Sequence, residues 1–432
     1  MTSVIDIIKN KDEIESFFNV LKQRGTVDEG NYITAVKQIV KDIKENKNLA
    51  LQLYTQKLDD PNFSIEAMEI SKEEQKAAFD SLDPNMQRVI RKAKDRIYDY
   101  HMHQKKETWT YENENGEIFG QKITPIQAVG VYVPGGKASY PSSVLMNVIP
   151  AKVAGVKNVT MCTPAPKGYI NPLTLACAYI CEVDHIYKIG GAQAIAAMAY
   201  GTETIAPVDK IVGPGNIFVA LAKKEVYGKV GIDSIAGPSE ICIIADDSAN
   251  AQWVAADLMA QAEHDEIASA VVFVTDEAKA AQIKKYVNFN FETAMRQNIL
   301  AVSLKNYSKI IVVKNLDEAF EYANRIAPEH LELAFDEARD YIDKVIHAGA
   351  IFVGHYSAES FGDYMAGPNH VLPTVGTARF FSPLSVDDFT KKSSIIELNK
   401  ASVNDLVDDV DAFAQAESLE MHAYSARLRG EK

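Results

Sequence analysis

The segment LMAQAEHDE combines side chains that can bind a metal ion or a polar substrate. Val254, just before it, and Leu258 and Gln261 within it are spaced so that they share one face of a helix predicted over 250–264. His264 follows Gln261 by one helical turn, so we expect it to continue this face toward the interior. An amide oxygen and an imidazole suit zinc, manganese or cobalt, although the same residues also fit a solvated helix end.

A second candidate site lies in the segment APEHLEL. Glu329 and His330 are neighbours just after Pro328, and a carboxyl–imidazole pair can act as a general acid and base. Neighbouring side chains on a regular strand point to opposite faces, so both can reach one ligand only if the backbone turns, which Pro328 permits. The alternative is a solvated turn before a strand.

The segment HYSAESFGDYMAGPNH, at 355–370, is dense in polar residues after a predicted strand. Glu359, Asp363 and His370 are candidates for binding because such side chains often follow α/β strands. The motif H-E-x-x-H is absent, which argues against a zinc protease of that class. The remaining histidines outside the tail are interpreted as structural: His101, His103, His185, His347 and His355.

Glycine pairs follow three predicted strands in the first half of the chain. They are Gly135-Gly136, Gly190-Gly191 and Gly213-x-Gly215, and such turns let the backbone approach a phosphate. None is a complete dinucleotide or P-loop fingerprint, so each one alone fits a tight turn equally well. Together, at the ends of parallel strands, they make nucleotide binding a comparable alternative.

Alternating strand and helix patterns predict the elements that position these residues. The pattern indicates an α/β protein with two Rossmann-like lobes, each built on a parallel sheet. We predict a helical N-terminal region at 1–120, a first lobe at 121–235, a second lobe at 236–375 and a helical tail at 376–432. The tail's apolar stripe fits contact with its own body or with another subunit.

Composition restricts the class of protein. A net charge of −14 argues against nucleic-acid binding. The sequence contains no run of 18 apolar residues, so no membrane span is expected. The N-terminus lacks a signal-peptide pattern, so a cytoplasmic location is expected. The cysteines lie in apolar context and are predicted to be buried, reduced thiols: Cys162, Cys177, Cys181 and Cys242.

A longer series of motifs carries a family resemblance. In this order, the chain contains VGVYVPGGKASYPSSVLMNVIPAKVAGV, GGAQAIAA, GPGN, AGPSE, QAEHD, APEHLEL, GPNHVLPT, ARFFSPLSVDDF and AESLEMHAYSARL. From about residue 120 to the C-terminus this series resembles the histidinol dehydrogenase family. The resemblance implies a homodimeric, zinc- and NAD-dependent enzyme that oxidises L-histidinol to L-histidine through the aldehyde, with two NAD reduced.

The resemblance also implies residue roles. The implied zinc ligands, which also face the substrate, are Gln261, His264, Asp363 and, from the other subunit, His422. The implied acid/base residues are Glu329 and His330, and His330 also contacts substrate. Further implied substrate contacts are Ser239, His370 and Glu417, and implied NAD contacts are Tyr132, Gln193 and Asn216. Alternatives are an NAD-dependent dehydrogenase of another amino alcohol, a metal-dependent hydrolase and a non-catalytic nucleotide-binding protein.

Overall fold

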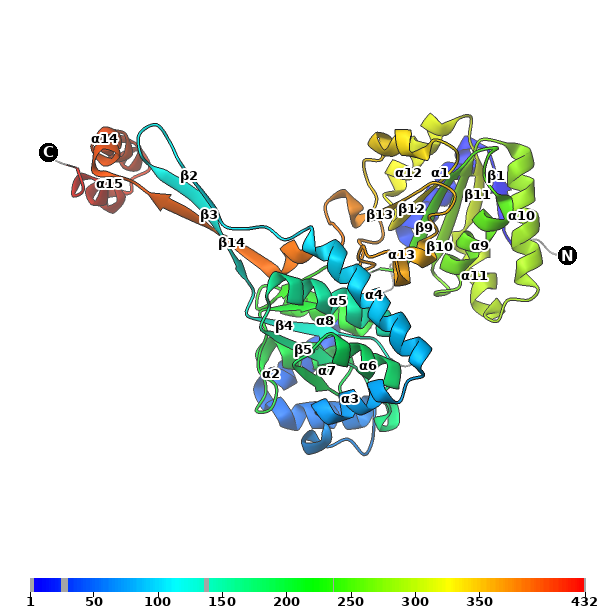
Figure 1. Ribbon diagram of the computed structural model, residues 1–432, viewed down its shortest axis with the longest axis horizontal. Coiled ribbons are helices and arrows are strands. Elements are labelled where there is room, and N and C mark those ends of the chain that lie inside the picture. The colour runs from blue at the N-terminus through cyan, green and yellow to red at the C-terminus, as the bar shows by residue number, and fades with distance from the viewer. Residues whose placement is uncertain (1–3, 25–29, 136–139, 236, 431–432) are drawn as a thin grey trace.

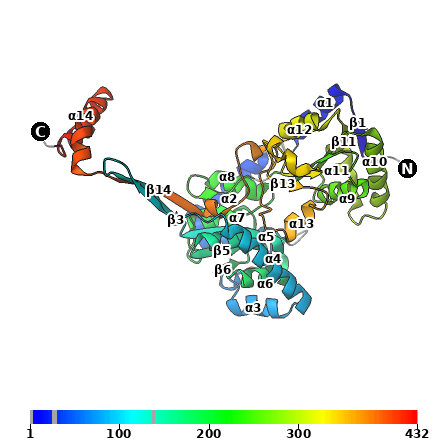
Figure 2. The ribbon, with the colours of Figure 1, turned by 45° about the horizontal axis from the view of Figure 1, so that its top comes forward.

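The protein folds into two α/β lobes and a projecting arm (Figure 1). The computed structural model describes residues 4–24, 30–135, 140–235 and 237–430. Each lobe contains one sheet whose strands are all parallel, so the predicted architecture of two parallel-sheet lobes is confirmed. A second view shows the arm projecting from the first lobe, with α14 at its far end away from both lobes (Figure 2).

The first lobe has a five-stranded sheet in the order β6-β5-β4-β7-β8. Its strands are β4 (Ala128–Tyr132), β5 (Asn158–Cys162), β6 (His185–Tyr187), β7 (Lys210–Val212) and β8 (Gly231–Ile232). From the central strand β4, the chain adds β5 and β6 on one side and then returns to add β7 and β8 on the other side. This reversal creates the topological switch point at which parallel sheets bind ligands, beyond the carboxyl ends of the strands.

Two apolar cores cover the two faces of this sheet. One core joins β4 to α3 (Lys72–Asp80), α4 (Pro84–Met102), α5 (Pro141–Ala154) and α6 (Pro172–Ile180). The other joins the opposite face to α2 (Gly30–Leu58), α7 (Gly191–Tyr200) and α8 (Ile217–Val226). Helices α2, α3 and α4 come from the predicted N-terminal region, so this region contributes directly to the core of the first lobe.

The second lobe has a six-stranded sheet in the order β1-β11-β10-β9-β12-β13. Its strands are β1 (Asp6–Ile8), β9 (Glu240–Ala245), β10 (Ser269–Val274), β11 (Lys309–Val312), β12 (His330–Ala334) and β13 (Ala350–Val353). The helices α9 (Ala251–Ala262), α10 (Glu277–Phe291) and α11 (Gln297–Tyr307) cover one face, and α1 (Lys11–Gln23) and α12 (Leu316–Ile326) cover the other. Helix α13 (Glu359–Tyr364) follows the last strand.

The prediction that the chain begins with a helix is wrong for its first residues. Asp6–Ile8 forms the edge strand β1, which pairs with β11 in the register Asp6↔Lys309. The apolar residues around β1 are β-branched, a composition that favours strands, and Lys309 Nζ lies 3.3 Å from Asp6 Oδ2. Three residues are too short for a periodic signal, so the helical pattern of the following residues concealed the strand.

The arm consists of a three-stranded antiparallel sheet and two terminal helices. These elements are β2 (Trp109–Glu112), β3 (Ile118–Pro125), β14 (Thr390–Glu397), α14 (Lys400–Ala416) and α15 (Glu420–Arg427). The polar segment ENENGE forms the turn of the β2–β3 hairpin, with Gly116 N donating to Asn113 O at 3.0 Å. The predicted helical tail is helical in α14 and α15, but it also contains the strand β14, which was not predicted and whose partner β3 lies far away in sequence.

Short 3-10 turns complete the described structure. They are η1 (Ile65–Ala67), η2 (Pro166–Gly168), η3 (Ala338–Lys344), η4 (Thr377–Arg379) and η5 (Val386–Phe389). Within the described ranges, no helix is both long enough and apolar enough to cross a membrane.

Candidate active site

Three side chains in the second lobe converge in a way that suits a metal ion. One ligand atom from each of His264, Glu359 and Asp363 lies within 4.8 Å of the others. Glu359 and Asp363 are one turn apart on α13, so the helix presents both carboxylates on the same face. An imidazole with two carboxylates is a ligand set that zinc accepts.

Gln261 lies beside this cluster and is completely buried. Its side-chain amide faces the Glu359 carboxylate and the His330 ring. With the amide nitrogen toward Glu359, it donates to Oε1 at 2.7 Å, and the amide oxygen remains available as a ligand. A group of imidazole, amide oxygen and carboxylates, of which Gln261 and Glu359 are buried, is rich in acceptors, and a divalent cation would satisfy it. The residues therefore fit a zinc site.

The predicted helical face extends to Gln261 but not to His264. Helix α9 ends at Ala262, and His264 is exposed in the turn that follows, with its backbone N–H donating to Gln261 O at 3.2 Å. The helix prediction through 264 is therefore wrong by two residues. The turn nevertheless brings the His264 imidazole to the carboxylates of α13.

Glu329 and His330 are both buried and lie side by side. Glu329 Oε2 is 3.8 Å from His330 Nδ1, and the backbone changes direction just before them, at Ala327, with φ of +54°. The backbone of Glu240 on β9 contacts both: its N–H donates to Glu329 Oε2 at 2.9 Å, and its carbonyl oxygen lies 3.1 Å from His330 Nδ1. Because a carbonyl only accepts, Nδ1 carries the hydrogen and Nε2 keeps its lone pair.

Burial shifts the titration of this group strongly. Removal from water raises the pKa of Glu329 and of Glu359 well above the usual range, with neighbouring carboxylates adding to the effect. The same desolvation lowers the pKa of His330 to about 4 and also lowers that of His370. At neutral pH both imidazoles are therefore neutral in the metal-free protein, and Glu329 is a stronger base than a solvated carboxylate.

His370 is joined to the same cluster by Asp363. Its Nδ1 lies 3.1 Å from the carbonyl oxygen of Asp363 and 3.9 Å from the carboxylate oxygen Oδ1. Ser239 immediately precedes Glu240 and is half-buried, and its carbonyl oxygen accepts from Ser269 N at 3.1 Å. The second-lobe site thus lies around the amino ends of β9 and β12. This is the edge opposite to the carboxyl ends of the strands, where parallel sheets usually bind ligands.

The three residues expected at a dinucleotide lie at the carboxyl edge of the first-lobe sheet. Tyr132 ends β4, and its hydroxyl accepts from Gly191 N at 3.0 Å. Gln193 is buried in the first turn of α7, and its Oε1 has no hydrogen-bond partner in the described part of the chain. Asn216 is exposed and caps α8 by accepting from the Phe218 and Val219 N–H groups.

Glycine is required at one of these turns. Gly213 has φ of +110°, and a Cβ atom there would lie 2.1 Å from the carbonyl oxygen of Tyr132. The backbones after β4 and β7 therefore approach closely at the switch point. The unpartnered Gln193 oxygen and this cradle fit a polar ligand such as a dinucleotide. Gly136 of the first glycine pair lies outside the described residues.

Two predicted site residues are not brought to the cluster within one chain. Glu417 follows α14 and His422 lies on α15, and both are exposed at the far end of the arm (Figure 1). Sequence reasoning named Glu359 as a binding candidate but did not assign it to this centre. Its spacing of four residues from Asp363 on one helix was the signal that could have identified it.

Comparison with known proteins agrees with this geometry. The family model described as histidinol dehydrogenase matches residues 22–430. The histidinol dehydrogenase of Neisseria meningitidis serogroup A is 49% identical over 395 residues, which cover 91% of this chain and 92% of that protein. That of Clostridium acetobutylicum is 46% identical over 431 residues, which cover 99% of this chain and all of that protein, 100%.

A solved structure shows the same architecture. The crystal structure of histidinol dehydrogenase from Elizabethkingia anophelis superposes with a TM-score of 0.93 at 36% identity, covering 99% of this chain and 98% of that one. An acetylating aldehyde dehydrogenase from Geobacillus thermoglucosidasius, at 12% identity and a TM-score of 0.50, shares the fold only. The matched length and the identity place this chain in the histidinol dehydrogenase family.

Proposed function

We propose that this chain oxidises L-histidinol to L-histidine through the aldehyde, reducing two NAD, as the final step of histidine biosynthesis. Family membership makes it an NAD-dependent, zinc-binding oxidoreductase. The observation that carries the substrate proposal is the cluster of His264, Glu359 and Asp363, with Gln261 against Glu359, beside the Glu329–His330 pair. Imidazole and amine groups of histidinol are both suitable zinc ligands, so this centre would orient the substrate next to an acid/base pair.

The zinc site is proposed to use Gln261, His264 and Asp363 from one chain and His422 of the partner subunit. Glu359 would hold the Gln261 amide by accepting its N–H, so that the amide oxygen faces the ion. Ser239, His370 and Glu417 are proposed substrate contacts. Tyr132, Gln193 and Asn216 are proposed NAD contacts, since they lie at the switch-point edge of the first-lobe sheet.

His330 and Glu329 are proposed to carry out different proton transfers in the two oxidation steps. When bound, zinc orients the substrate and NAD accepts hydride. His330 is neutral and its Nε2 carries the lone pair, so it takes the hydroxyl proton in the alcohol step. In the second step Glu329, made more basic by burial, takes a proton from the water that adds to the aldehyde, and His330 again removes a hydroxyl proton from the hydrate.

A dimer with shared sites is proposed from the arm. Its end exposes large apolar side chains, with Phe413 71% and Met421 69% exposed, and such residues are normally covered by a partner. Glu417 and His422 lie on the same end, away from the cluster that they are expected to complete. The arm of one chain would therefore reach the centre of the other.

The proposed reaction is tested by following NADH absorbance with histidinol as substrate, with and without a strong zinc chelator. We expect two NADH per histidinol consumed, loss of activity with the chelator and recovery on adding zinc. One NADH per substrate would contradict the four-electron reaction. Activity with another amino alcohol, but none with histidinol, would favour a related dehydrogenase.

A thiol nucleophile is not part of the proposed mechanism. The four cysteines are free and buried, and burial raises the pKa of the Cys181 thiol to about 12. Iodoacetamide applied to the folded enzyme should therefore leave its rate unchanged within error. The same treatment in denaturant, analysed by mass, provides the positive control for alkylation. Inactivation that parallels labelling of one cysteine in the folded enzyme would instead indicate that a thiol adds to the aldehyde as a thiohemiacetal.

A further inference from the structure

The segment 365–371 carries one part of the candidate centre onto the other lobe. It begins directly after α13, the helix that carries Asp363, contains His370 and ends against the first lobe. Side chains from the first-lobe helix α4 and from the segment itself make the polar contacts that hold it there. We call this group of contacts the clasp, and define it by Arg96 and Asn369.

Arg96 forms the outer half of the clasp. From α4, its Nε donates to the carbonyl oxygen of Met365 and its Nη2 donates to that of Ala366 at 3.3 Å. The next residue, Gly367, has φ of +116°, and a Cβ there would lie 2.9 Å from the Arg96 carbonyl oxygen. The segment thus lies directly on the α4 backbone, and one guanidinium fixes two successive carbonyls.

Asn369 forms the inner half of the clasp and is only 4% exposed. Its Nδ2 donates to the carbonyl oxygen of Met146 in α5 at 2.6 Å and lies 3.4 Å from Nε2 of His101 in α4. Its Oδ1 accepts from Val371 N at 2.9 Å, which fixes the backbone on the far side of His370. The side chain that precedes His370 is therefore anchored in the core of the first lobe.

We propose that Arg96 and Asn369 are positioning residues that hold Asp363 and His370 in the active centre by fixing the 365–371 segment to the first lobe. His370 Nδ1 contacts the Asp363 carbonyl, so the two site residues move with this segment as one unit. The clasp rests on the proposed function, because it assumes that Asp363 binds zinc. It makes the first lobe, which is the proposed NAD lobe, responsible for the geometry of the zinc centre in the second.

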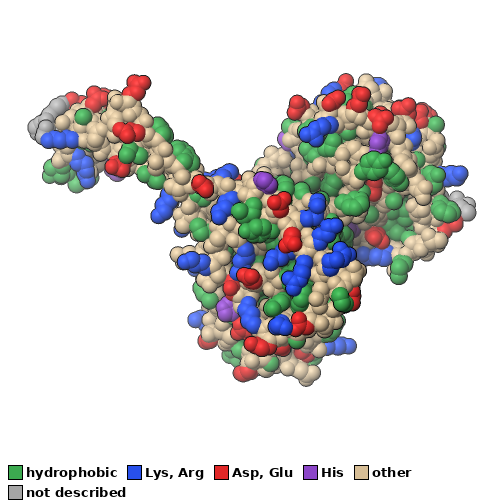
Figure 3. All heavy atoms as spheres, viewed as in Figure 1, with side chains coloured by type: hydrophobic (Ala, Val, Ile, Leu, Met, Phe, Trp, Pro, Cys, Tyr) green, Lys and Arg blue, Asp and Glu red, His purple; other side chains and the backbone are tan. Residues whose placement is uncertain are grey.

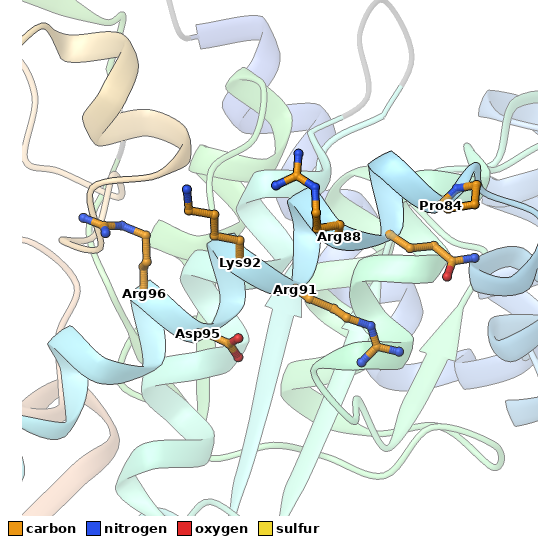
Figure 4. A pocket seen from close by; sticks show the side chains of 7 residues that line it. Pro84, Arg88, Arg91, Lys92, Asp95 and Arg96 are labelled. Atoms are coloured by element: carbon orange, nitrogen blue, oxygen red, sulfur yellow. The ribbon is translucent and has the colours of Figure 1, made fainter.

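The helix that carries Arg96 also supplies a matched control. Lys and Arg side chains gather over α4 on the face shown in Figure 3, and a shallow groove there is lined by Arg88, Arg91, Lys92 and Arg96. Arg96 reaches from the helix toward the segment 365–371, drawn in pale orange, whereas Arg88 lies two turns away along the same groove (Figure 4). Arg88 donates to Asn85, within its own helix. Both arginines are exposed, so alanine at either leaves no buried cavity.

The test compares Arg96→Ala, Arg96→Lys and Arg88→Ala in the full-length protein. Zinc affinity is measured by competition with a chromophoric chelator, and NAD binding by calorimetry. We expect Arg96→Ala to weaken zinc binding roughly 10–100-fold, as is usual when a group that orients a metal ligand is lost. kcat should fall with it, while the NAD dissociation constant and Tm stay near wild type. Arg96→Lys, which keeps the charge but not the planar fork, should be intermediate, and Arg88→Ala should equal wild type.

Asn369→Asp provides a second measurement, because it keeps the shape and removes the Nδ2 donor to Met146. It should weaken zinc binding in the same direction as Arg96→Ala, with KM for NAD unchanged. Unchanged zinc affinity in Arg96→Ala would overturn the clasp, and so would an equal loss in Arg88→Ala, which would reflect surface charge alone. A wild-type chain that binds zinc but rejects histidinol would overturn the proposed reaction only, and the zinc comparison would still decide the clasp.

Discussion

Replacing Glu329 by glutamine is expected to slow the aldehyde-to-acid step by about 10²–10⁴-fold, the usual effect of losing one acid/base group. The amide keeps the size of the side chain but has no basic oxygen of comparable strength, so it cannot take a proton from the attacking water. Alcohol oxidation should be slowed much less, because His330 is the base in that step. The two steps are separated by supplying histidinol or histidinal and following NADH in single turnovers.

Two further variants define this division of labour. His330→Gln should slow both half-reactions, because the imidazole is the proposed base in each. Glu321→Gln, on the exposed face of α12, should leave both unchanged and controls for the loss of one carboxylate. Equal slowing of both steps in Glu329→Gln would mean that the carboxyl group supports the whole centre and not the hydration step.

Co-expressing His264→Ala with His422→Ala chains is expected to restore activity that neither variant has alone. If the arm of each subunit supplies His422 to the other, a mixed dimer has one site with both ligands changed and one intact site. Random pairing in a symmetric dimer makes half of the dimers mixed, so about a quarter of wild-type activity should return in the unfractionated mixture and about half in the isolated mixed dimer. The measurement is NADH formation per mole of purified dimer, with different affinity tags isolating the mixed species.

The reciprocal pairing is the matched control. A chain with both substitutions, co-expressed with wild type, should produce mixed dimers in which each site lacks one ligand, so the isolated mixed dimer should be nearly inactive. If the arm instead folded back onto its own subunit, the results would be exchanged: the first mixture would stay inactive, and the second would keep half of the wild-type activity per dimer.

Much of the fold could be predicted because buried parallel strands have a strong pattern. In β9 and β10 every residue is buried, and such strands appear in the sequence as continuous apolar runs. β14 lacks this pattern because most of its side chains are exposed, and it pairs with β3 from more than 250 residues earlier in the chain. Local patterns therefore located the two sheets but not the strands that depend on distant partners.

The site was predictable in its chemistry but not in its geometry. Gln261 was identified from helical spacing, and it is buried as that spacing implied. His264 was assigned to the same helix, yet it reaches the centre through the turn after α9. Glu359 was identified only as a general binding candidate, because its place in the centre depends on how α13 packs against α9 and β12. Sequence spacing describes one element at a time, whereas this centre is assembled from several.

The position of β1 has a consequence for synthesis of the protein. Strand β1 belongs to the second lobe but is synthesised before the first lobe, and its hydrogen-bond partner β11 follows only after the whole first lobe has been made. The paired residues Asp6 and Lys309 are 303 positions apart. Meanwhile the first lobe has all its strands and can fold as the nascent chain lengthens. The N-terminal segment must therefore stay unpaired during most of translation, and closing the outer edge of the second sheet is a late event.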